Sequence, residues 1–416
     1  MEFQPAVRSA GTVLAVTGVL LPPLAVFAPL GAAPILGVAA IAMIILDWRR
    51  CRAQFGASAG LAMLLGGLGL WASASFLWSI IPNHSLFEGL RFLVVCAGGL
   101  TLLAGGLSVT KHERRRIDKA LLIGLGLALF LLAIERFTHQ PITRWWHHIT
   151  DNYLPLARFD RGVIVVVLSG WAAICAKEGS WPRLALILVF LATTLLMVSE
   201  AAMLAALAGT ATFIVARFAP RLASAAMIAG TLVLGIAIPI ATPGFDTVLA
   251  LHDNLHAIKP SGIHRLLIWR FAADHAAERP FLGWGMDASR AIPGGQTDLN
   301  VMLPGLHYGE PAQALPLHPH DAALQWQLEL GIPGLALGLA IVIWIIYRVG
   351  WEKRLSPTRR AGALALTMAA LTIGLLSFGV WQAWWLSTLW LSAGLFAATA
   401  SGGADDETLT PDDPAS

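Results

Sequence analysis

The residue types best suited to acid–base chemistry stand at the end of a long polar segment, where His318, His320 and Asp321 precede an apolar stretch. Two prolines keep this approach extended, and Asp321 is a favourable N-cap, so a helix is predicted to begin at Ala322. His320 would then lie at the positive end of a helix dipole, which disfavours the imidazolium form. A neutral, positioned imidazole is what a general base requires. The alternative is that both histidines only cap a helix at a wet surface.

Three arginines occupy unusual positions. Arg91 lies inside an apolar run, about one turn from its outer end, where a charge usually faces a polar cavity or a partner. Glu88 is three residues away on the same helical face and is an available partner. Arg161 opens another apolar run, and Arg265 lies on the early turns of an amphipathic helix predicted over residues 261–279. An arginine at a helix end can also simply extend to lipid headgroups, so position alone leaves the role of Arg161 open.

Metal binding is the other chemistry that histidines suggest. His318 and His320 could bind zinc together with His264 or His307. However, no tight set of His, Cys and carboxylate residues surrounds them in the sequence. The outer segments also lack an Asp-x-Asp pair that would suit a divalent ion on a diphosphate. The sequence therefore predicts a site without metal.

The composition predicts the elements that position these residues. Hydrophobic residues make up 56% and charged residues 13% of the 416-residue chain, with a mean hydropathy of +0.69, which indicates an all-α, polytopic membrane protein. Because a helix needs about twenty apolar residues to cross the hydrocarbon, we predict about twelve transmembrane helices. They cover residues 11–29, 32–47, 57–80, 87–107, 117–136, 161–176, 182–199, 201–217, 222–240, 330–348, 361–379 and 382–400. The tryptophans of the last span and its approach are most simply an aromatic belt at the membrane interface: Trp381, Trp384, Trp385 and Trp390. The three cysteines imply no disulfide framework.

The distribution of basic residues predicts the orientation. Most of the 28 Lys and Arg residues fall on short loops that would share one side of the membrane, and the positive-inside rule places that side and both termini in the cytoplasm. The two polar segments, 137–160 and 241–320, then lie outside. The predicted regions are nine helices in 1–240, a large, partly helical outer segment carrying the candidate site in 241–320, three helices in 321–400 and a disordered acidic tail in 401–416.

These residues together resemble a known family. The run His320-Asp321-Ala322-Ala323-Leu324, followed by Glu329-Leu330-Gly331 and Gly334, resembles the His-Asn-x-x-Leu…Glu-x-Gly-x-x-Gly signature of the O-antigen ligase/polymerase superfamily. Asp321 stands where the family usually has Asn, and His318 completes a ligase-like His-x-His form. Arg265…Trp269…Pro280-Phe281-Leu282-Gly283-Trp284-Gly285 is similar to a second family pattern, and Arg161 is similar to an arginine that opens a middle helix. Ser199-Glu200 departs from the Ser-Arg that the family often has at an outer hairpin.

The resemblance implies a bacterial inner-membrane glycosyltransferase whose active site is periplasmic. Such proteins use a glycan linked to undecaprenyl diphosphate, and the ligases move it onto a sugar of the lipid A core. The resemblance then implies His320 as the general base and Arg161 and Arg265 as the cations that hold the departing diphosphate. His318, Arg91 and Asp321 complete the expected substrate-binding set. Direct displacement with inversion is the simplest mechanism, and no cofactor, metal or nucleic-acid partner is expected.

Two alternatives share parts of this pattern. A polymerase of the same superfamily, or a related protein-glycosylating oligosaccharyltransferase, would have the same helical scaffold and the same diphosphate chemistry. A transporter or channel would instead scatter charges along several helix interiors, often with broken helices repeated in two halves. Here the charges gather in the outer segments and at helix mouths, which argues against a transporter or channel, and the His-x-His form favours a ligase.

Overall fold

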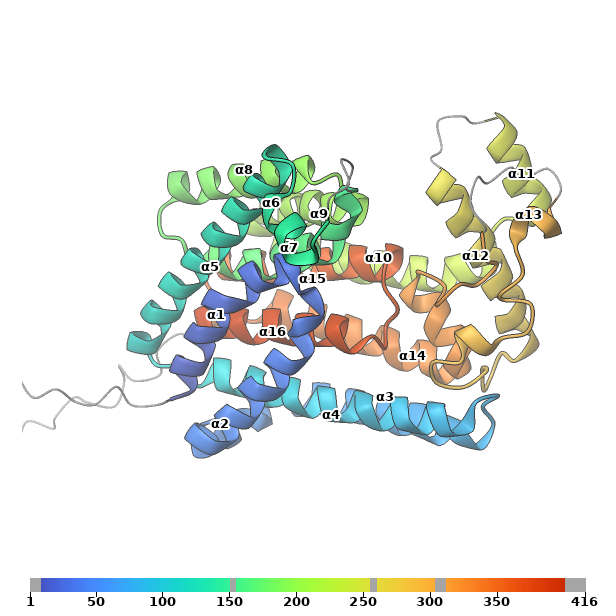
Figure 1. The fold of residues 1–416 in the computed structure, drawn as a ribbon. Coiled ribbons are helices and arrows are strands. Elements are labelled where there is room, and N and C mark those ends of the chain that lie inside the picture. Colours follow the sequence, from blue (N-terminus) through green and yellow to red (C-terminus); the bar gives the residue numbers. More distant parts are fainter. Residues whose placement is uncertain (1–8, 150–154, 255–259, 304–311, 401–416) are drawn as a thin grey trace, which may run out of the picture.

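The computed structural model describes residues 9–149, 155–254, 260–303 and 312–400. Within these ranges the chain is helical, apart from turns and a single isolated β-bridge between Asp298 and Gln313. The long apolar helices are α1 (Ala10–Phe27), α2 (Ala32–Gln54), α3 (Ala59–Ala74), α4 (Pro82–Leu107), α5 (Lys111–Phe137), α7 (Asp160–Ala176), α8 (Ser180–Leu196), α9 (Glu200–Phe218), α10 (Pro220–Ala241), α14 (Ala322–Trp351), α15 (Pro357–Leu376) and α16 (Ala383–Ala400). Short 3-10 turns accompany them at η1 (Pro29–Gly31), η2 (Phe55–Ser58), η3 (Ser75–Leu77) and η4 (Leu156–Phe159). The predicted all-α class is confirmed, and the long helices form a bundle (Figure 1).

Each of the twelve predicted spans coincides with one of these long helices. By length and composition alone, nine segments of the described chain qualify as membrane spans, and one of them, Pro29–Leu77, contains both α2 and α3. The nine do not include α8, which has 17 residues, or α16. Multiple apolar helices are therefore established, whereas twelve crossings stay a prediction. The predicted acidic tail, 401–416, lies outside the described residues.

Small residues allow the helices to approach closely. A Cβ added to Gly124 of α5 would lie 2.2 Å from the carbonyl oxygen of Gly18 in α1, so only glycine fits there. Likewise, a Cβ at Gly106 of α4 would lie 2.4 Å from the carbonyl oxygen of Gly394 in α16. Such contacts are typical of helices that pack within a membrane, where close backbone approach replaces a hydrophobic driving force.

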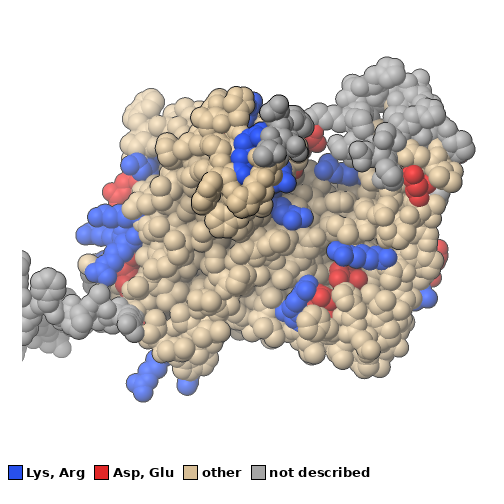
Figure 2. All heavy atoms as spheres, in the orientation of Figure 1, with Lys and Arg blue, Asp and Glu red and all other residues tan. Residues whose placement is uncertain are grey.

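Charged side chains are unevenly distributed over the bundle. On the face shown in Figure 2 they gather at one end of the bundle and around the centre and the outer group, leaving a broad surface of uncharged side chains between them. An uncharged band flanked by charged ends is what a protein crossing a bilayer requires.

The outer segment forms a second, smaller helical group at one end of the bundle, built from α11 (Phe245–Asn254), α12 (Pro260–Glu278), η5 (Ser289–Ala291) and α13 (Leu299–Met302) (Figure 1). The predicted helix is confirmed as α12, whose Ile263, Leu267 and Phe271 are buried. Its amphipathic character is not confirmed, because the residues from Gly262 to Ala276 are buried or half-buried on every side. These side chains pack in a core of their own with residues of α11 and the first turns of α14. The first outer segment contains the short helix α6 (Pro141–His147).

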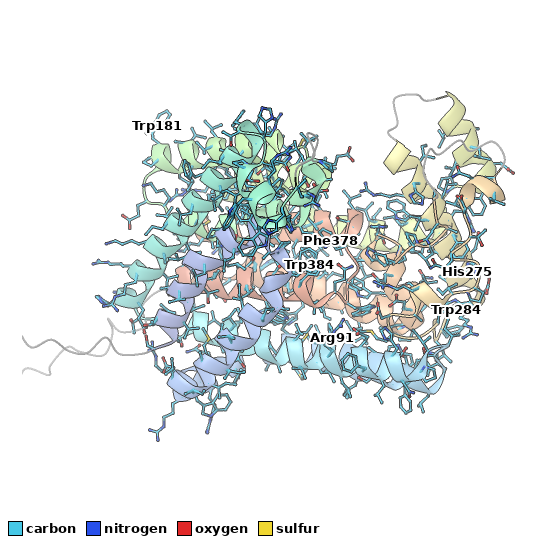
Figure 3. All side chains as sticks on the ribbon, viewed as in Figure 1. Arg91, Trp181, His275, Trp284, Phe378 and Trp384 are labelled. Atoms are coloured by element: carbon cyan, nitrogen blue, oxygen red, sulfur yellow. The ribbon has the colours of Figure 1, made fainter. Side chains whose placement is uncertain are left out.

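The prediction of an aromatic interface belt is wrong. Trp381, Trp384, Trp385 and Trp390 are all at least nine-tenths buried. They pack against other helices, since the Trp381 ring meets Phe92 edge-on with its centroid 5.6 Å away. Trp384 lies beside Phe378 inside the bundle (Figure 3), with ring centroids 4.7 Å apart. The tryptophans are thus core residues, and two of them, Trp381 and Trp384, line the cavity of the candidate site.

Candidate active site

The histidine loop, residues 317–321, enters α14 as the sequence predicts. The carboxylate oxygen Oδ1 of Asp321 accepts a hydrogen bond of 2.7 Å from the backbone N–H of Leu324, and the helix begins at Ala322. Asp321 is 1% exposed, and its other oxygen, Oδ2, has no hydrogen-bond partner among the described residues. Burial raises the pKa of Asp321 to about 7, because a buried carboxylate loses its hydration.

His320 is held in a defined tautomer. Its Nδ1 lies 2.5 Å from the backbone carbonyl oxygen of Ser377, just after α15. A carbonyl only accepts, so Nδ1 carries the proton and Nε2 keeps a bare lone pair. Burial lowers the pKa of His320, the Ser377 carbonyl raises it, and the charges of Arg265 and His264 lower it again. The net direction is downward, so His320 is neutral near pH 7 and can accept a proton at Nε2.

The ring nitrogens of His318 contact the backbone N–H groups of His320 and Gly379. The backbone N–H of His320 lies 3.2 Å from Nδ1 of His318, and the N–H of Gly379 lies 3.0 Å from Nε2. A neutral ring has one bare nitrogen and can satisfy only one of these donors, while a second proton would leave neither satisfied. Burial is the largest cause that lowers the pKa of His318, to about 3. His318 is therefore a neutral, buried ring whose nitrogens face the backbone.

A buried carboxylate fixes the start of α14 to the surrounding loops. Glu329 is fully buried, and its Oε2 accepts hydrogen bonds from the backbone N–H of Asp287 at 2.8 Å and from Nε1 of Trp381 at 2.5 Å. Its Oε1 accepts from Nε2 of Gln325 at 3.1 Å and from the hydroxyl of Ser289. Four donors thus converge on one side chain and join three chain segments. The family pattern contains Glu329, but the sequence does not indicate these partners.

The glycines of the two family patterns meet backbone to backbone. Gly331, which interrupts α14 with a φ of +67°, could not carry a side chain, because a Cβ would lie 2.2 Å from the carbonyl oxygen of Phe281. The N–H groups of Trp284 and Gly285 donate to the carbonyl oxygens of Leu328 and Glu329, at 3.0 and 2.8 Å. Pro-x-x-Gly-x-Gly and Glu-x-Gly are therefore two halves of one structural junction, which places residues 284–290 beside the histidine loop.

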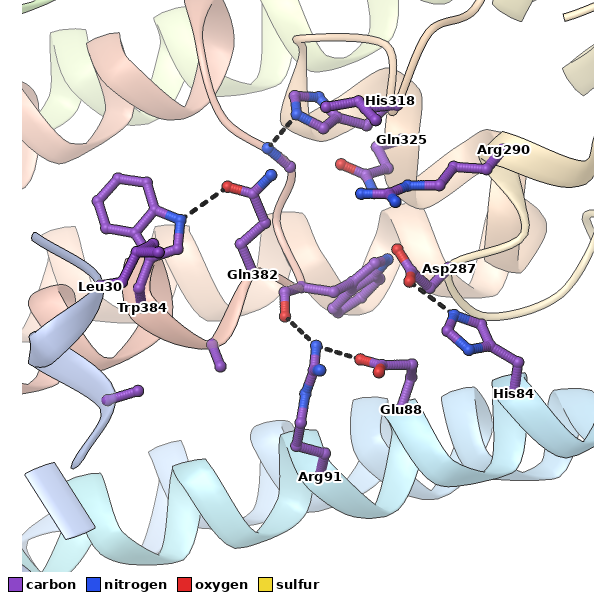
Figure 4. Close-up of a pocket in the computed structure, with 15 residues that line it drawn as sticks. Leu30, His84, Glu88, Arg91, Asp287, Arg290, His318, Gln325, Gln382 and Trp384 are labelled. Carbon is purple, nitrogen blue, oxygen red and sulfur yellow. Dashed lines mark hydrogen bonds and ion pairs between the residues drawn. The ribbon is translucent and has the colours of Figure 1, made fainter. Parts of the chain in front are cut away.

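A polar cavity of about 470 Å³ opens beside this junction (Figure 4). Its lining includes His318 from the histidine loop, Arg290 from η5, and Gln382 and Trp384 from the approach to α16 and its first turn. Arg91 lies in the wall formed by α4. The lining also includes Leu30, Ala33, His84, Glu88, Asp287, Leu317, Gln325, Gly379, Trp381 and Ala383.

Arg91 does face a polar cavity, and it is paired. It forms an ion pair with the predicted partner, Glu88, which is 4% exposed, and its Nη2 donates to the carbonyl oxygen of Trp381 at 3.1 Å. The charge of Arg91 is therefore largely balanced by Glu88. Arg290, which the sequence analysis missed, also points into the cavity (Figure 4) and is close enough to lower the pKa of His318. No family pattern includes Arg290, so its position could not be anticipated.

Arg161 and Arg265 approach the site on different elements. Arg161 stands at the start of α7, the most buried candidate span of the described chain. Its guanidinium lies 5.9 Å from the ring centre of Trp384, which lines the cavity. The positive charge of Arg265, on α12, lowers the pKa of His320. The structure thus associates Arg161 with the cavity and Arg265 with the candidate base.

One cluster could hold a metal ion, in a place that the sequence analysis did not anticipate. Side-chain ligand atoms of His84, Glu88 and Asp287 lie within 4.8 Å of one another. This cluster includes neither His318 nor His320. However, Nε2 of His84 and Oδ2 of Asp287 already bind each other at 2.8 Å, and Glu88 is paired with Arg91. His307, one of the zinc ligands considered above, lies outside the described residues.

Comparisons with known proteins agree with this architecture. A family model described as O-Antigen ligase matches residues 184–339, which include α12, the histidine loop and the start of α14. A protein of Rickettsia bellii is 32% identical over 330 residues, covering 77% of this chain and 76% of the relative. Proteins of Rickettsia felis and Rickettsia prowazekii are 30% and 31% identical with the same coverage. Each bears the name "putative polysaccharide ligase". The chain belongs to the O-antigen ligase family.

Proposed function

We propose that this protein is a glycosyltransferase that moves O-antigen polysaccharide from undecaprenyl diphosphate to a sugar of the lipid A core. Membership of the O-antigen ligase family, relatives named as polysaccharide ligases and multiple apolar helices support this proposal. The observation that carries it is the tautomer of His320, whose Nδ1–H donates to the Ser377 carbonyl and leaves Nε2 bare. A neutral base that lies close enough to the Arg265 guanidinium to have its pKa lowered by it suits transfer of a sugar from a diphosphate.

In the proposed reaction, Nε2 of His320 accepts the proton of an acceptor hydroxyl. The hydroxyl oxygen attacks the anomeric carbon of the donor sugar while the bond from that carbon to the diphosphate oxygen breaks. The electron pair leaves with undecaprenyl diphosphate, and the configuration at the anomeric carbon inverts. The imidazolium that forms keeps its Nδ1–H on the Ser377 carbonyl, so the ring does not have to reorient during the proton transfer.

Arg161 and Arg265 are the proposed cations for the diphosphate. A guanidinium binds two phosphate oxygens at once, and fixed cations stabilise charge that develops on a leaving group. Arg91 has its charge balanced by Glu88, which suits a neutral part of the substrate better than the diphosphate. His318 and Asp321 are proposed to position His320, since the His318 ring faces the backbone of the loop and Asp321 begins α14. The mechanism requires no cofactor or metal.

The proposed location is the inner membrane, with both termini in the cytoplasm and the site on the periplasmic face. The support is the positive-inside pattern, because basic residues concentrate at helix ends on the predicted cytoplasmic side, such as 48–52 in α2 and 111–119 in α5. The histidine loop and the helices α11–α13 belong to the segment predicted on the other side. The donor and acceptor are both membrane lipids there, so the site must open to the bilayer.

The test is transfer by purified protein in liposomes. We expect a preformed glycan on undecaprenyl diphosphate to move to lipid A core, without growth of the chain and without added Mg²⁺ or Mn²⁺. Excess chelator should leave the rate unchanged, and loss of activity with chelator that zinc restores would contradict the metal-free mechanism. In cells, deletion should leave bare core and long glycans on the lipid carrier. Core that carries a single repeat would identify a polymerase instead.

A further inference from the structure

The cavity beside the histidine loop contains polar groups that the proposed chemistry of His320 does not use. Glu88 and Asp287 supply carboxylate oxygens, and Arg91 and Arg290 supply guanidinium N–H groups (Figure 4). Gln382 adds an amide, whose Oε1 accepts a hydrogen bond of 3.0 Å from Nε1 of Trp384. Because that contact uses the oxygen of Gln382, its NH₂ group remains oriented as a donor.

The carboxylate of Asp287 is held rigidly. Asp287 adopts a left-handed backbone conformation with a φ of +54°, which is uncommon for a residue other than glycine. Its backbone N–H donates to Glu329 at 2.8 Å, and its Oδ2 binds Nε2 of His84 at 2.8 Å. A fixed backbone and a fixed oxygen are the properties of a group that orients a ligand.

The charges of the cavity distinguish between possible ligands. Two carboxylates repel a diphosphate, which would bind best where only cations and N–H donors face it. Two guanidiniums repel a divalent cation, and Arg91 already occupies Glu88. Sugar hydroxyls both donate and accept hydrogen bonds, so they match a lining that mixes carboxylates, guanidiniums and an amide. Trp384 supplies an aromatic wall against which the apolar face of a sugar ring can pack.

We propose that this cavity is a sugar subsite, which recognises the hydroxyl groups of an uncharged sugar ring through Glu88, Asp287 and Gln382. The proposal rests on the proposed function, because it assigns one ring of a glycan substrate to the cavity. His318 lines the cavity and contacts the His320 ring, with centroids 4.4 Å apart, so a sugar bound there lies next to the candidate base. Donor and acceptor both carry sugars, and the experiment separates them.

The first experiment measures binding without turnover, so that it does not depend on the proposed reaction. Saturation-transfer NMR in a detergent without sugar groups would use the methyl glycosides of glucose, galactose, mannose and rhamnose as probes. We expect binding of at least one probe to the protein and to the control Glu278→Gln, whose side chain is 55% exposed outside the cavity. Asp287→Asn and Gln382→Leu should each weaken binding about 10-fold or more, as expected for a lost hydrogen bond to a fixed polar group. Absence of binding, or equal binding in all variants, overturns the proposal.

The second experiment identifies the source of the sugar. In the transfer assay, Gln382→Leu should raise the KM of one substrate about 10-fold, with kcat changed much less. A raised KM for the lipid A core assigns the subsite to the acceptor, and a raised KM for the donor assigns it to the donor. Unchanged KM for both substrates overturns the proposal. Tight binding of Mn²⁺ that Asp287→Asn abolishes would also overturn it, since the cluster would then be a cation site.

Discussion

Glu329→Gln should destabilise the site, because each oxygen of this buried carboxylate accepts two hydrogen bonds. Oε1 accepts from Ser289 and Gln325, and Oε2 accepts from the N–H of Asp287 and from Trp381. In the variant, an NH₂ group replaces one of these oxygens and faces two donors. With the NH₂ group at the position of Oε1, the hydroxyl of Ser289 can turn and accept from it, so one obligate donor, Nε2 of Gln325, loses its acceptor.

The expected loss follows from that count. An unsatisfied buried donor costs about 1–3 kcal/mol, and that is the expected loss for the single donor left without an acceptor. The same variant should lose activity, because Asp287 and Trp381 line the cavity and would no longer be held by Glu329. Glu329→Gln conserves volume, so the effect does not come from a cavity.

The assay is thermal unfolding in detergent, followed by size-exclusion chromatography of the heated samples. We expect the apparent midpoint of Glu329→Gln to fall by roughly 1–3 °C, because a chain of this length unfolds with a large entropy change. Glu278→Gln is the matched control, because it makes the same chemical change on a half-exposed side chain of α12. If Glu329→Gln unfolds at the temperature of the control, the four-donor network does not hold the site together.

Three further predictions concern the site residues. His320→Ala should fold normally and lose transfer by roughly 10²–10⁴-fold, and near-normal turnover of this variant would exclude His320 as the base. In the unmodified protein, kcat/KM should fall with acid only below pH 6.5, because the pKa of His320 is lowered from that value. Arg265→Lys keeps the charge but loses the planar fork, so its activity should stay well below that of the unmodified protein in the liposome assay; full activity would exclude bidentate binding. For Asp321, the pKa raised from 3.8 to about 7 means that the folded state loses up to about 4 kcal/mol as pH rises from 4 to 7. Asp321→Asn should remove that loss, so its thermal midpoint relative to the unmodified protein should rise between pH 4 and 7, and an equal pH dependence would contradict it.

Local patterns predicted local structure well. The N-cap at Asp321, the helix α12 and the Arg91–Glu88 pair are confirmed. Each of these depends on residues within about one or two turns of each other, where helix geometry decides which side chains meet. The same reasoning predicted the apolar helices, since hydropathy is a property of a continuous stretch of chain.

Contacts between distant segments could not be predicted from local sequence patterns. Ser377 reaches the site from one place in the chain and Asp287 and Arg290 from another, and no spacing rule connects them to His320. The tryptophans before and within α16 were misassigned because a Trp-rich helix end has the same composition whether it faces the membrane interface or packs in the core. Only the arrangement of α4 and α16 against each other separates the two cases.

The proton on the proposed base is placed by a chain segment that the family signature does not contain. Ser377 accepts from His320 through its backbone carbonyl, 57 residues further along the chain, so the identity of its side chain is irrelevant to this contact. At Gly379 in the same segment the residue type does matter, because a Cβ there would lie 2.8 Å from Cδ2 of His318. His320 itself has a φ of +60°, a conformation that costs a residue other than glycine about 1–2 kcal/mol, and the contacts with Ser377 and His318 offset that cost. The signature around His320 supplies the base, and the segment between α15 and α16 decides which of its nitrogens can act.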